Sequence, residues 1–290
     1  MLRSSRRRTK RITGKRVLTG WALLVYAFLY VPILLVVVFA FNKNRDVTLW
    51  RGFTTAWFGR ALRDPAYIPA IETSFKIAVI NSIVATILGT MAALALSRMR
   101  RSFRVPFDVV VYLTLVVPEI VIAVASLIFF SQAHEHFSAF PALGWKTILL
   151  AHVVFNASLV MLIVRARFVG MGSTLEEASF DLGSGPISTF RQVTLPRLLP
   201  AILAGSLLSF TFSFDDYVLS NFTAGATTQT WPMVIFSAVR FGVTPAINAL
   251  ATMMLGVTVV LIFATGIVLR RGARTTGVEG KGVAGALGLG

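Results

Sequence analysis

Residues 173–196 read STLEEASFDLGSGPISTFRQVTLP, and this stretch predicts a helix, a glycine turn and a second helix. Two overlapping capping boxes open it, because Ser173 is followed three residues later by Glu176, and Thr174 by Glu177. In a capping box the two side chains bond backbone N–H groups that the first helical turn leaves without partners. A helix is therefore predicted to begin here, outside the long apolar runs of the chain.

The helix over 175–182 is predicted to stop at Gly183, since glycine readily adopts the left-handed conformation that often closes a helix. Pro186 suits the first position of a second short helix. Pro196 is then expected to begin a long apolar helix. The stretch is thus too long and too organised to be a simple connection between two apolar segments.

The composition of the chain is that of a membrane protein. Its 290 residues are 56% hydrophobic and 14% charged, and the mean hydropathy is +0.76. A soluble domain carries about 25% charged residues, so this chain has too few polar side chains to cover its apolar surface. The absence of cysteine excludes disulfides, thiolate metal sites and cysteine nucleophiles. The sequence predicts an all-α integral membrane protein.

Six apolar stretches approach the length of about 20 residues that a spanning helix needs. They are residues 17–41, 75–96, 107–130, 147–164, 198–214 and 249–269. The first is interpreted as an uncleaved signal anchor, because its apolar run exceeds the ~7–15 residues of a signal-peptide core and no small-residue cleavage site follows. Six transmembrane helices are therefore expected.

The basic residues predict an orientation for these spans. Lys and Arg number 28 against 12 Asp and Glu, a net charge of +16 that could suggest nucleic acid. Most of the basic residues, however, lie in the two tails and in two loops on one side of the six spans. Because positively charged segments stay cytoplasmic, both termini are predicted to be cytoplasmic. Membrane lipid is the expected environment, and no nucleic acid partner is expected.

The organised loop resembles a known motif. Its pattern is Glu177-Ala178-Ser179, three residues, Gly183, nine residues, then Val193-x-Leu195-Pro196. This resembles the EAA loop of bacterial ABC importer permeases, E-A-A, three residues, G, nine residues, I-x-L-P, with Ser179 and Val193 as conservative departures. The resemblance implies a type I ABC importer permease fold, in which the loop, about 165–196, is a coupling helix that docks on an ATPase subunit. The alternative from the residues alone is an ordinary amphipathic helix at the inner surface.

By this resemblance the small and acidic residues of the loop couple the chain to the ATPase. The expected coupling residues are Glu176, Glu177, Ala178, Ser179, Gly183, Leu195 and Pro196. ATP and Mg²⁺ are expected in the partner ATPase, and no cofactor is expected in this chain. No segment fits a phosphate-binding loop, since Gly282 follows the Gly280–Lys281 pair where Ser or Thr is needed.

Further segments narrow the resemblance to the spermidine/putrescine permeases, of the second-permease type. They are SFDDY at 213–217, FGVTPAINAL at 241–250, PEI at 118–120 and NS at 81–82. Ala246 departs from the acidic residue expected in many relatives. The resemblance covers about 21–271 and implies a multi-pass protein of the bacterial cytoplasmic membrane. Its implied partners are a second permease subunit, two copies of an ABC ATPase and an extracytoplasmic binding protein, for which 222–248 is the expected docking face.

Three domain segments follow from this interpretation. Residues 1–16 form a basic cytoplasmic tail, and 17–271 form the transmembrane permease domain. Residues 272–290 form a flexible, glycine-rich cytoplasmic tail. The tails are expected to be unstructured.

Acidic residues near the spans predict a path for a cation. An acid within a span costs about 2.5–3.5 kcal/mol on insertion scales, so it should face a cavity or a partner. Carboxylates pair with the ammonium groups of polyamines, and aromatic rings contact their cations and methylene stems. The expected path residues are Glu119, Asp215, Asp216, Tyr217 and Phe214. The alternatives are that Asp216 caps the fifth span or pairs with Arg240, and that Glu119 makes a structural hydrogen bond.

Other interpretations stay open at this point. The same machinery could carry a quaternary amine, a phosphonate or a ferric ion, and a stand-alone secondary carrier is a further alternative. No catalytic residues are predicted, because no nucleophile and base converge. No metal site is predicted, because the adjacent residues at 134–136, His-Glu-His, have no fixed ligand geometry in a loop.

Two faces of small residues predict close helix packing. They are Ala85-Gly89-Ala93 and Ala201-Gly205-Ser209. The sequence leaves open whether these faces build the core of the chain or contact a second permease subunit. His152 and Asn156, one turn apart on the fourth span, are expected to bond neighbouring helices.

Overall fold

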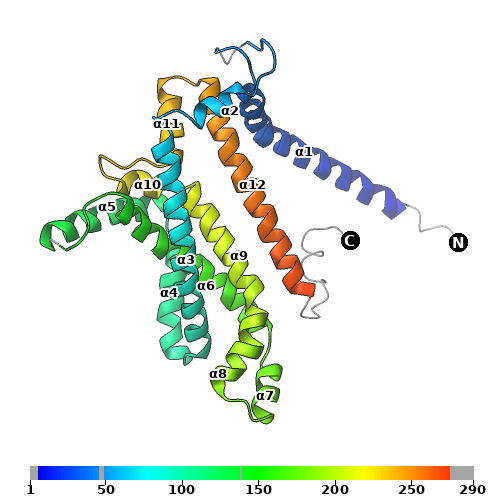
Figure 1. Ribbon diagram of the computed structural model, residues 1–290. Helices are drawn as coiled ribbons and strands as arrows, with labels where there is room; N and C mark the ends of the chain where they lie inside the picture. The colour runs from blue at the N-terminus through cyan, green and yellow to red at the C-terminus, as the bar shows by residue number, and fades with distance from the viewer. Residues whose placement is uncertain (1–5, 46–48, 138, 275–290) are drawn as a thin grey trace. The chain divides into compact units, whose positions relative to one another are not determined.

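The computed structural model describes residues 6–45, 49–137 and 139–274, and these residues are almost entirely helical (Figure 1). One isolated antiparallel bridge joins Asn42 and Phe53. In chain order the helices are α1 (Arg6–Ala40), α2 (Ala56–Ala61), α3 (Ile68–Arg98), α4 (Arg101–Val116), α5 (Glu119–His136), α6 (Trp145–Gly170), α7 (Thr174–Asp181), α8 (Pro186–Thr189), the π-helical turn η1 (Phe190–Thr194), α9 (Leu195–Phe214), α10 (Val218–Thr223), α11 (Trp231–Phe241) and α12 (Pro245–Arg274).

Among the described residues, five helices are long and apolar enough to cross a membrane, and a bent pair of helices makes a sixth if it counts as one span. The five are Arg16–Ala40, Ile68–Arg98, Trp145–Gly170, Pro186–Phe214 and Pro245–Arg270. Each contains or nearly matches one of the stretches predicted from hydropathy. The helical spans run beyond the apolar runs at their ends, because polar residues continue a helix once it has formed.

The third predicted span is not one continuous helix. It is divided between α4 and α5, which meet at an angle of 107°. Val117 is extended there, with φ −65° and ψ 132°, and Pro118 follows it. Proline provides no N–H for a helical hydrogen bond and disfavours the helical conformation of the residue before it. The break makes Glu119 the first residue of α5 instead of a mid-span residue.

The described residues fall into two compact units, one comprising residues up to 64 together with 238–254, and the other 65–237 together with 255 onward. In the first unit Trp57 of α2 is buried beside Ala40 and Ala249. The Trp57 indole N–H donates to the backbone carbonyl of Asn42 at 2.8 Å. This contact holds α2 on the end of α1.

The core of the second unit is formed by α3, α6 and α9, which lie side by side (Figure 1). A Cβ at Gly89 of α3 would lie 2.6 Å from the carbonyl oxygen of Ala157, and one at Gly205 of α9 would lie 3.2 Å from Val160. Both glycines therefore allow close approach to α6. The two predicted faces of small residues thus pack inside this chain.

The predicted helix–turn–helix is present, with α7 ending in a Schellman motif. Gly183 has φ +82° and donates its N–H to Phe180 at 2.8 Å. The N–H of Ser184 donates to the carbonyl of Ser179 at 3.1 Å. The expected glycine stop is confirmed by these contacts.

Two details of the loop differ from the sequence prediction. Ser173 makes no side-chain capping bond, and Glu176 instead accepts a hydrogen bond from the Thr194 hydroxyl. The tertiary partner on η1 thus replaces the expected capping box. The second short helix does not end before Pro196, because α8, η1 and α9 form one continuous helix over Pro186–Phe214.

The expectation of an unstructured tail over 1–16 is wrong for its described part, since α1 already begins at Arg6. Backbone hydrogen bonding continues from the apolar span into the basic segment. Residues 1–5 and 275–290 lie outside the described residues. In the other direction α12 extends to Arg274.

Candidate functional site

A cleft of about 350 Å³ lies in the second unit, where α5 begins, α9 ends and α10 packs beside α6. It is lined by Glu119, Ile122, His152, Phe155, Asn156, Phe212, Asp215, Asp216, Tyr217, Val218 and Leu219. Four of the five predicted path residues meet here, from segments nearly 100 positions apart in the chain. Three of the lining residues are carboxylic acids, and none is lysine or arginine.

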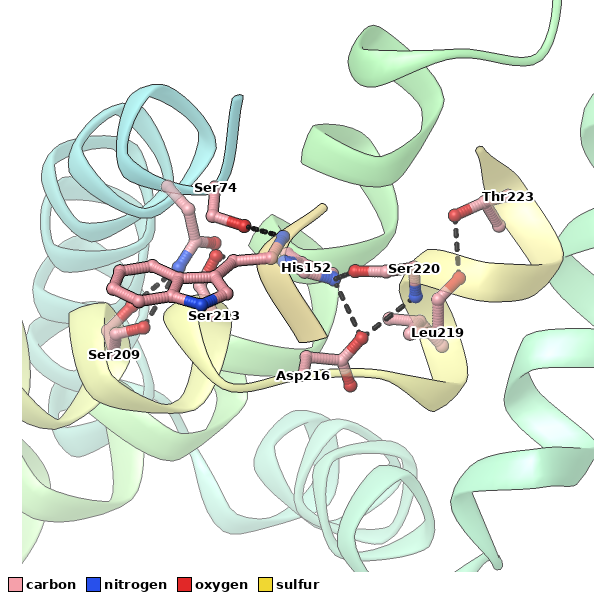
Figure 2. Close-up of polar contacts among 10 residues, drawn as sticks. Ser74, His152, Ser209, Ser213, Asp216, Leu219, Ser220 and Thr223 are labelled. Carbon is pink, nitrogen blue, oxygen red and sulfur yellow. Dashed lines mark hydrogen bonds and ion pairs between the residues drawn. The ribbon is translucent and has the colours of Figure 1, made fainter. Parts of the chain in front are cut away.

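His152 and Asp216 form the buried polar centre of this cleft (Figure 2). The Nε2 atom of His152 lies 3.1 Å from Oδ1 of Asp216, and its Nδ1 atom lies 2.8 Å from the Ser213 hydroxyl. Ser220 adds a hydroxyl 3.3 Å from Nε2 and donates its backbone N–H to Asp216 at 2.8 Å. The network joins α6 to the end of α9 and the start of α10.

This network decides between the interpretations of Asp216. Its carboxylate bonds the backbone of α10, so the capping role is present, at the start of α10 and not at the end of the fifth span. Its side-chain hydrogen-bond partner is His152, whose side chain is only 2% exposed. Asp216 nevertheless lines the cleft, so the capping and path interpretations are compatible.

Glu119 and Asp215 form the more open acidic wall of the cleft. Both residues are exposed. Glu119 and Asp215 line the same cleft as the Asp216 carboxylate. Neighbouring carboxyl groups repel one another unless a proton or a cation lies between them. The arrangement therefore favours a cation in the cleft.

Of the two aromatic residues predicted to line the path, one lines the cleft and the other does not. Tyr217 lines the cleft, and its ring stacks on Phe236 with centroids 4.1 Å apart. Phe214 is buried, with 1% exposed, and does not line the cleft. Its ring packs on Phe75, Phe210 and Trp231. Phe214 is thus a core residue, and its position does not fit the predicted contact with a substrate.

Polar side chains continue from the cleft along α9 toward α3. Asn81 donates to the Ser209 carbonyl at 3.1 Å, and the Ser82 hydroxyl donates to the Ser206 carbonyl at 2.8 Å. Ser74 accepts the backbone N–H of Trp231 at 2.7 Å (Figure 2). The first two bonds hold the backbone of α9 against α3, and the third joins α3 to the start of α11.

Sequence reasoning missed the place of His152 and Asn156 in the cleft. Helix–helix bonding was expected of both, and His152 does bond α9 and α10. Asn156 is 2% exposed and lines the cleft, while its amide oxygen has no partner. Their spacing of four residues puts both on one face of α6. The spacing of four residues between His152 and Asn156 was the sequence signal that could have placed both side chains in one site.

In the predicted coupling loop, 165–196, the two adjacent glutamates have different surroundings. Glu176 bonds Thr194, whereas Glu177 and Ala178 are exposed. The Ser179 hydroxyl bonds that of Thr189 at 3.0 Å and so ties α7 to α8. Leu195 is half-buried and Pro196 exposed at the start of α9, while Gly183 lies at the exposed turn.

Large apolar side chains are exposed around this turn. Leu182 is 88% exposed and Ile187 83%, with Leu175 and Phe180 about half exposed. Exposed apolar groups beside a charged residue are typical of a surface that contacts another protein. The loop is connected to the rest of the unit through Arg167, whose Nε donates to the Arg197 carbonyl at 3.2 Å.

A bundle of apolar spanning helices with an acidic cleft and an organised exposed loop defines a membrane transport component rather than an enzyme. Residues 85–272 match the family described as "Binding-protein-dependent transport system inner membrane component", and the chain belongs to this family. It is therefore a transport permease located in the inner membrane.

Curated relatives of the chain have been named as polyamine permeases. The putrescine transport system permease protein PotI of Escherichia coli K12 is 42% identical over 237 residues, covering 81% of this chain and 84% of the relative. The spermidine/putrescine transport system permease protein PotC of Haemophilus influenzae is 37% identical over 247 residues, covering 85% and 94%. PotC of Escherichia coli K12 is 33% identical over 257 residues, covering 89% and 95%.

Solved structures of ABC importers share the fold. A chain of a bacterial alginate ABC transporter, in complex with its alginate pentasaccharide-bound periplasmic protein, has a TM-score of 0.64 at 16% identity and covers 92% of this chain and 98% of its own. A chain of the inward-facing MetNI methionine transporter has a TM-score of 0.53 at 16% identity, covering 72% and 94%. The predicted type I ABC importer permease fold is confirmed.

Proposed function

We propose that this chain is the permease subunit of an ATP-driven importer of polyamines, such as putrescine and spermidine. The observation that carries the substrate class is the acidic cleft formed by Glu119, Asp215 and Asp216. Relatives at 33–42% identity that are named as putrescine and spermidine permeases support it. The substrate moves by alternating access driven by a separate ATPase.

The chemistry of the cleft suits a flexible chain that carries ammonium groups. Asp215 and Glu119 attract the ammonium groups, and the ring of Tyr217 contacts a cation or a methylene stem. A volume of about 350 Å³ falls in the range of small-ligand sites, which starts near 300 Å³. An anionic phosphonate is disfavoured by three acids with no lysine or arginine in the lining.

The loop 165–196 is proposed to be the coupling segment, with the ATPase as its partner. Glu177 and Ala178 are exposed at its surface, beside the apolar Leu182 and Ile187. The remaining coupling residues act indirectly, because Glu176 and Ser179 hold α7 against η1 and α8. With this loop cytoplasmic, both termini lie on the cytoplasmic side, as the basic residues also favour.

The proposed assembly follows from the same reasoning. Two copies of an ABC ATPase bind ATP and Mg²⁺, and a second permease subunit completes a heterodimer around the path. An extracytoplasmic binding protein delivers the substrate, with residues 222–248 as its docking face. The family description, which names a binding-protein-dependent system, supports the last of these partners.

The quaternary amine and ferric ion alternatives remain chemically consistent with the carboxylates of the cleft. A quaternary amine has no N–H to donate, and Fe³⁺ prefers oxygen ligands. Among the described residues no group of three metal-ligating side chains could hold a metal ion. This favours an organic cation.

The test is uptake of labelled putrescine and spermidine by the assembled complex. Asp215→Asn, which removes a charge from the cleft, is expected to reduce uptake about tenfold or more, because a charged hydrogen bond contributes about 1.5–3 kcal/mol. Glu72→Gln is the matched control, since Glu72 is exposed on α3 and does not line the cleft. Equal uptake by both variants would contradict the path.

A further inference from the structure

Asn156 is a buried polar side chain in the wall of the cleft whose hydrogen-bonding capacity the fold does not use. It lies one helical turn from His152 on α6, and only 2% of it is exposed. Its amide oxygen has no partner within the structure. A buried acceptor without a partner is unfavourable and rare in folded proteins, so the site favours a ligand that donates an N–H there.

The neighbouring polar groups of the wall are already occupied. Both ring nitrogens of His152 have partners, Ser213 on one side and Asp216 with Ser220 on the other. The Oδ1 atom of Asp216 also accepts the backbone N–H of Ser220. Asp216 is therefore fixed by the protein, and the adaptable acceptors are Asn156 and the carboxylates of Glu119 and Asp215.

We propose that Asn156, Glu119 and Asp215 form a subsite for one primary ammonium group of the substrate, an inference that rests on the proposed function. A primary ammonium donates three hydrogen bonds. The two carboxylates supply charge and two acceptors, and the amide oxygen of Asn156 supplies the third. The amide oxygen is buried in the structure without a cation; rotation about the Cβ–Cγ bond exchanges the positions of the amide oxygen and nitrogen and would bring the oxygen to the cation.

The subsite distinguishes ammonium groups by their N–H donors, and not by charge alone. Carboxylates attract a methylated ammonium as they do a primary one. The amide oxygen of Asn156 bonds only to an ion that has an N–H to donate. Asn156 is thus a specificity-determining residue for primary amines, and Asp216 is a positioning residue of the wall.

Two substitutions of similar size test whether uptake depends on the hydrogen-bond acceptor of Asn156 or only on the shape of its side chain. Asn156→Leu removes the acceptor and is expected to lower putrescine uptake by the assembled complex about tenfold or more at saturating loaded binding protein. Asn156→Asp keeps an oxygen acceptor and is expected to retain at least half of the uptake. Equal uptake by these two variants, whether high or low, would overturn the role of the acceptor.

Asn81→Leu provides the matched control for substituting a buried asparagine in a spanning helix. Asn81 is fully buried on α3, but its amide donates to Ser209 and it does not line the cleft. Asn81→Leu and Asn81→Asp are expected to show no preference for the acceptor-bearing variant. The same pattern at both asparagines would indicate a structural effect and overturn the subsite.

A binding readout covers the case in which Asn156→Leu fails to fold. The chain contains no cysteine, so Ile122→Cys, at another position that lines the cleft, gives a single reporter thiol in a complex with cysteine-free partner chains and leaves Asn156 in place. Saturating putrescine is expected to slow its reaction with a small cationic thiol reagent at least fivefold. Tetramethylene-bis(trimethylammonium), which has no N–H, is expected to slow it less than twofold.

The outcomes of these experiments distinguish the subsite from the proposed function. Equal protection by the two amines, or protection by neither, would overturn the subsite while uptake of putrescine by the wild-type complex upholds the function. Failure of the wild-type complex to take up any polyamine would overturn the function, and the subsite with it.

Discussion

The imidazole of His152 lies between the Ser213 hydroxyl, 2.8 Å from Nδ1, and the Asp216 carboxylate, 3.1 Å from Nε2. Both His152 and Asp216 are largely buried, with side chains 2% and 10% exposed. The pair joins α6 to the segment between α9 and α10, and it fixes one wall of the acidic cleft.

Removing His152 is expected to destabilise the second unit. His152→Ala removes a hydrogen bond to the largely buried Asp216 carboxylate, and a hydrogen bond to a charged group contributes about 1.5–3 kcal/mol. Thermal unfolding of the purified chain in detergent measures the loss. His134→Ala is the control, because His134 is exposed at the end of α5 and its change should stay within about 0.5 kcal/mol. Equal stability of the two variants would show that the buried pair is not stabilising.

The close approach of α3 and α6 at Gly89 predicts a second effect on stability. A Cβ there would lie 2.6 Å from a backbone oxygen and 2.8 Å from the Cβ of Val160. Gly89→Ala should therefore destabilise the chain by about 1–3 kcal/mol, as overpacking does. Gly256→Ala on α12 meets no atom within 4 Å and should be neutral or stabilising. A Gly89→Ala variant as stable as Gly256→Ala would refute this packing.

The left-handed turn at Gly183 predicts an effect on coupling. Gly183→Ala places a Cβ on a residue with φ +82°, which costs about 1–2 kcal/mol, and it disturbs the α7 surface proposed to dock the ATPase. We expect transport-coupled ATP hydrolysis by the assembled complex to fall several-fold. Gly185→Ala is the control, since Gly185 has φ −74° and open space around it. Unchanged uptake and hydrolysis in Gly183→Ala would argue against docking through this turn.

Helix α4 has no buried residue, and Asp108 pairs it with Arg165 of α6. Arg104, 3.7 Å from Asp108, adds a second cation. Asp108→Arg alone should destabilise the attachment of α4 by about 1–3 kcal/mol. The double variant Asp108→Arg/Arg165→Asp, which exchanges the two charges, should restore most of the lost stability of this attachment. Hydrogen exchange of the α4 amides in each variant measures the attachment, and a swap no better protected than Asp108→Arg would speak against the pair.

The long apolar runs and the glycine stop were predictable because each depends on residues close together in sequence. Five spans follow from hydropathy, and the turn follows from Gly183. The meeting of Glu119 with Asp215 in one cleft was also expected, since both acids had to avoid lipid.

Features that depend on distant partners were not predictable. Glu176 had a local capping bond available, but its carboxylate instead accepts a hydrogen bond from the hydroxyl of Thr194, 18 residues away. His152 reaches Asp216 across 64 residues. Phe214 is expected in the path because an aromatic ring can contact a cation or a methylene stem, whereas its ring is buried in the core. The break at Pro118 depends on whether neighbouring helices compensate the lost hydrogen bond, which the local sequence does not specify.

The most direct measurement of the central claim is competition for putrescine uptake by the assembled wild-type complex. Labelled putrescine is supplied with ATP and excess unlabelled spermidine, a quaternary amine, a phosphonate or ferric ion. A polyamine permease is expected to take up the label in an ATP-dependent manner that spermidine suppresses and the other solutes leave unchanged. Competition by one of the other solutes alone, with no effect of spermidine, would contradict the account.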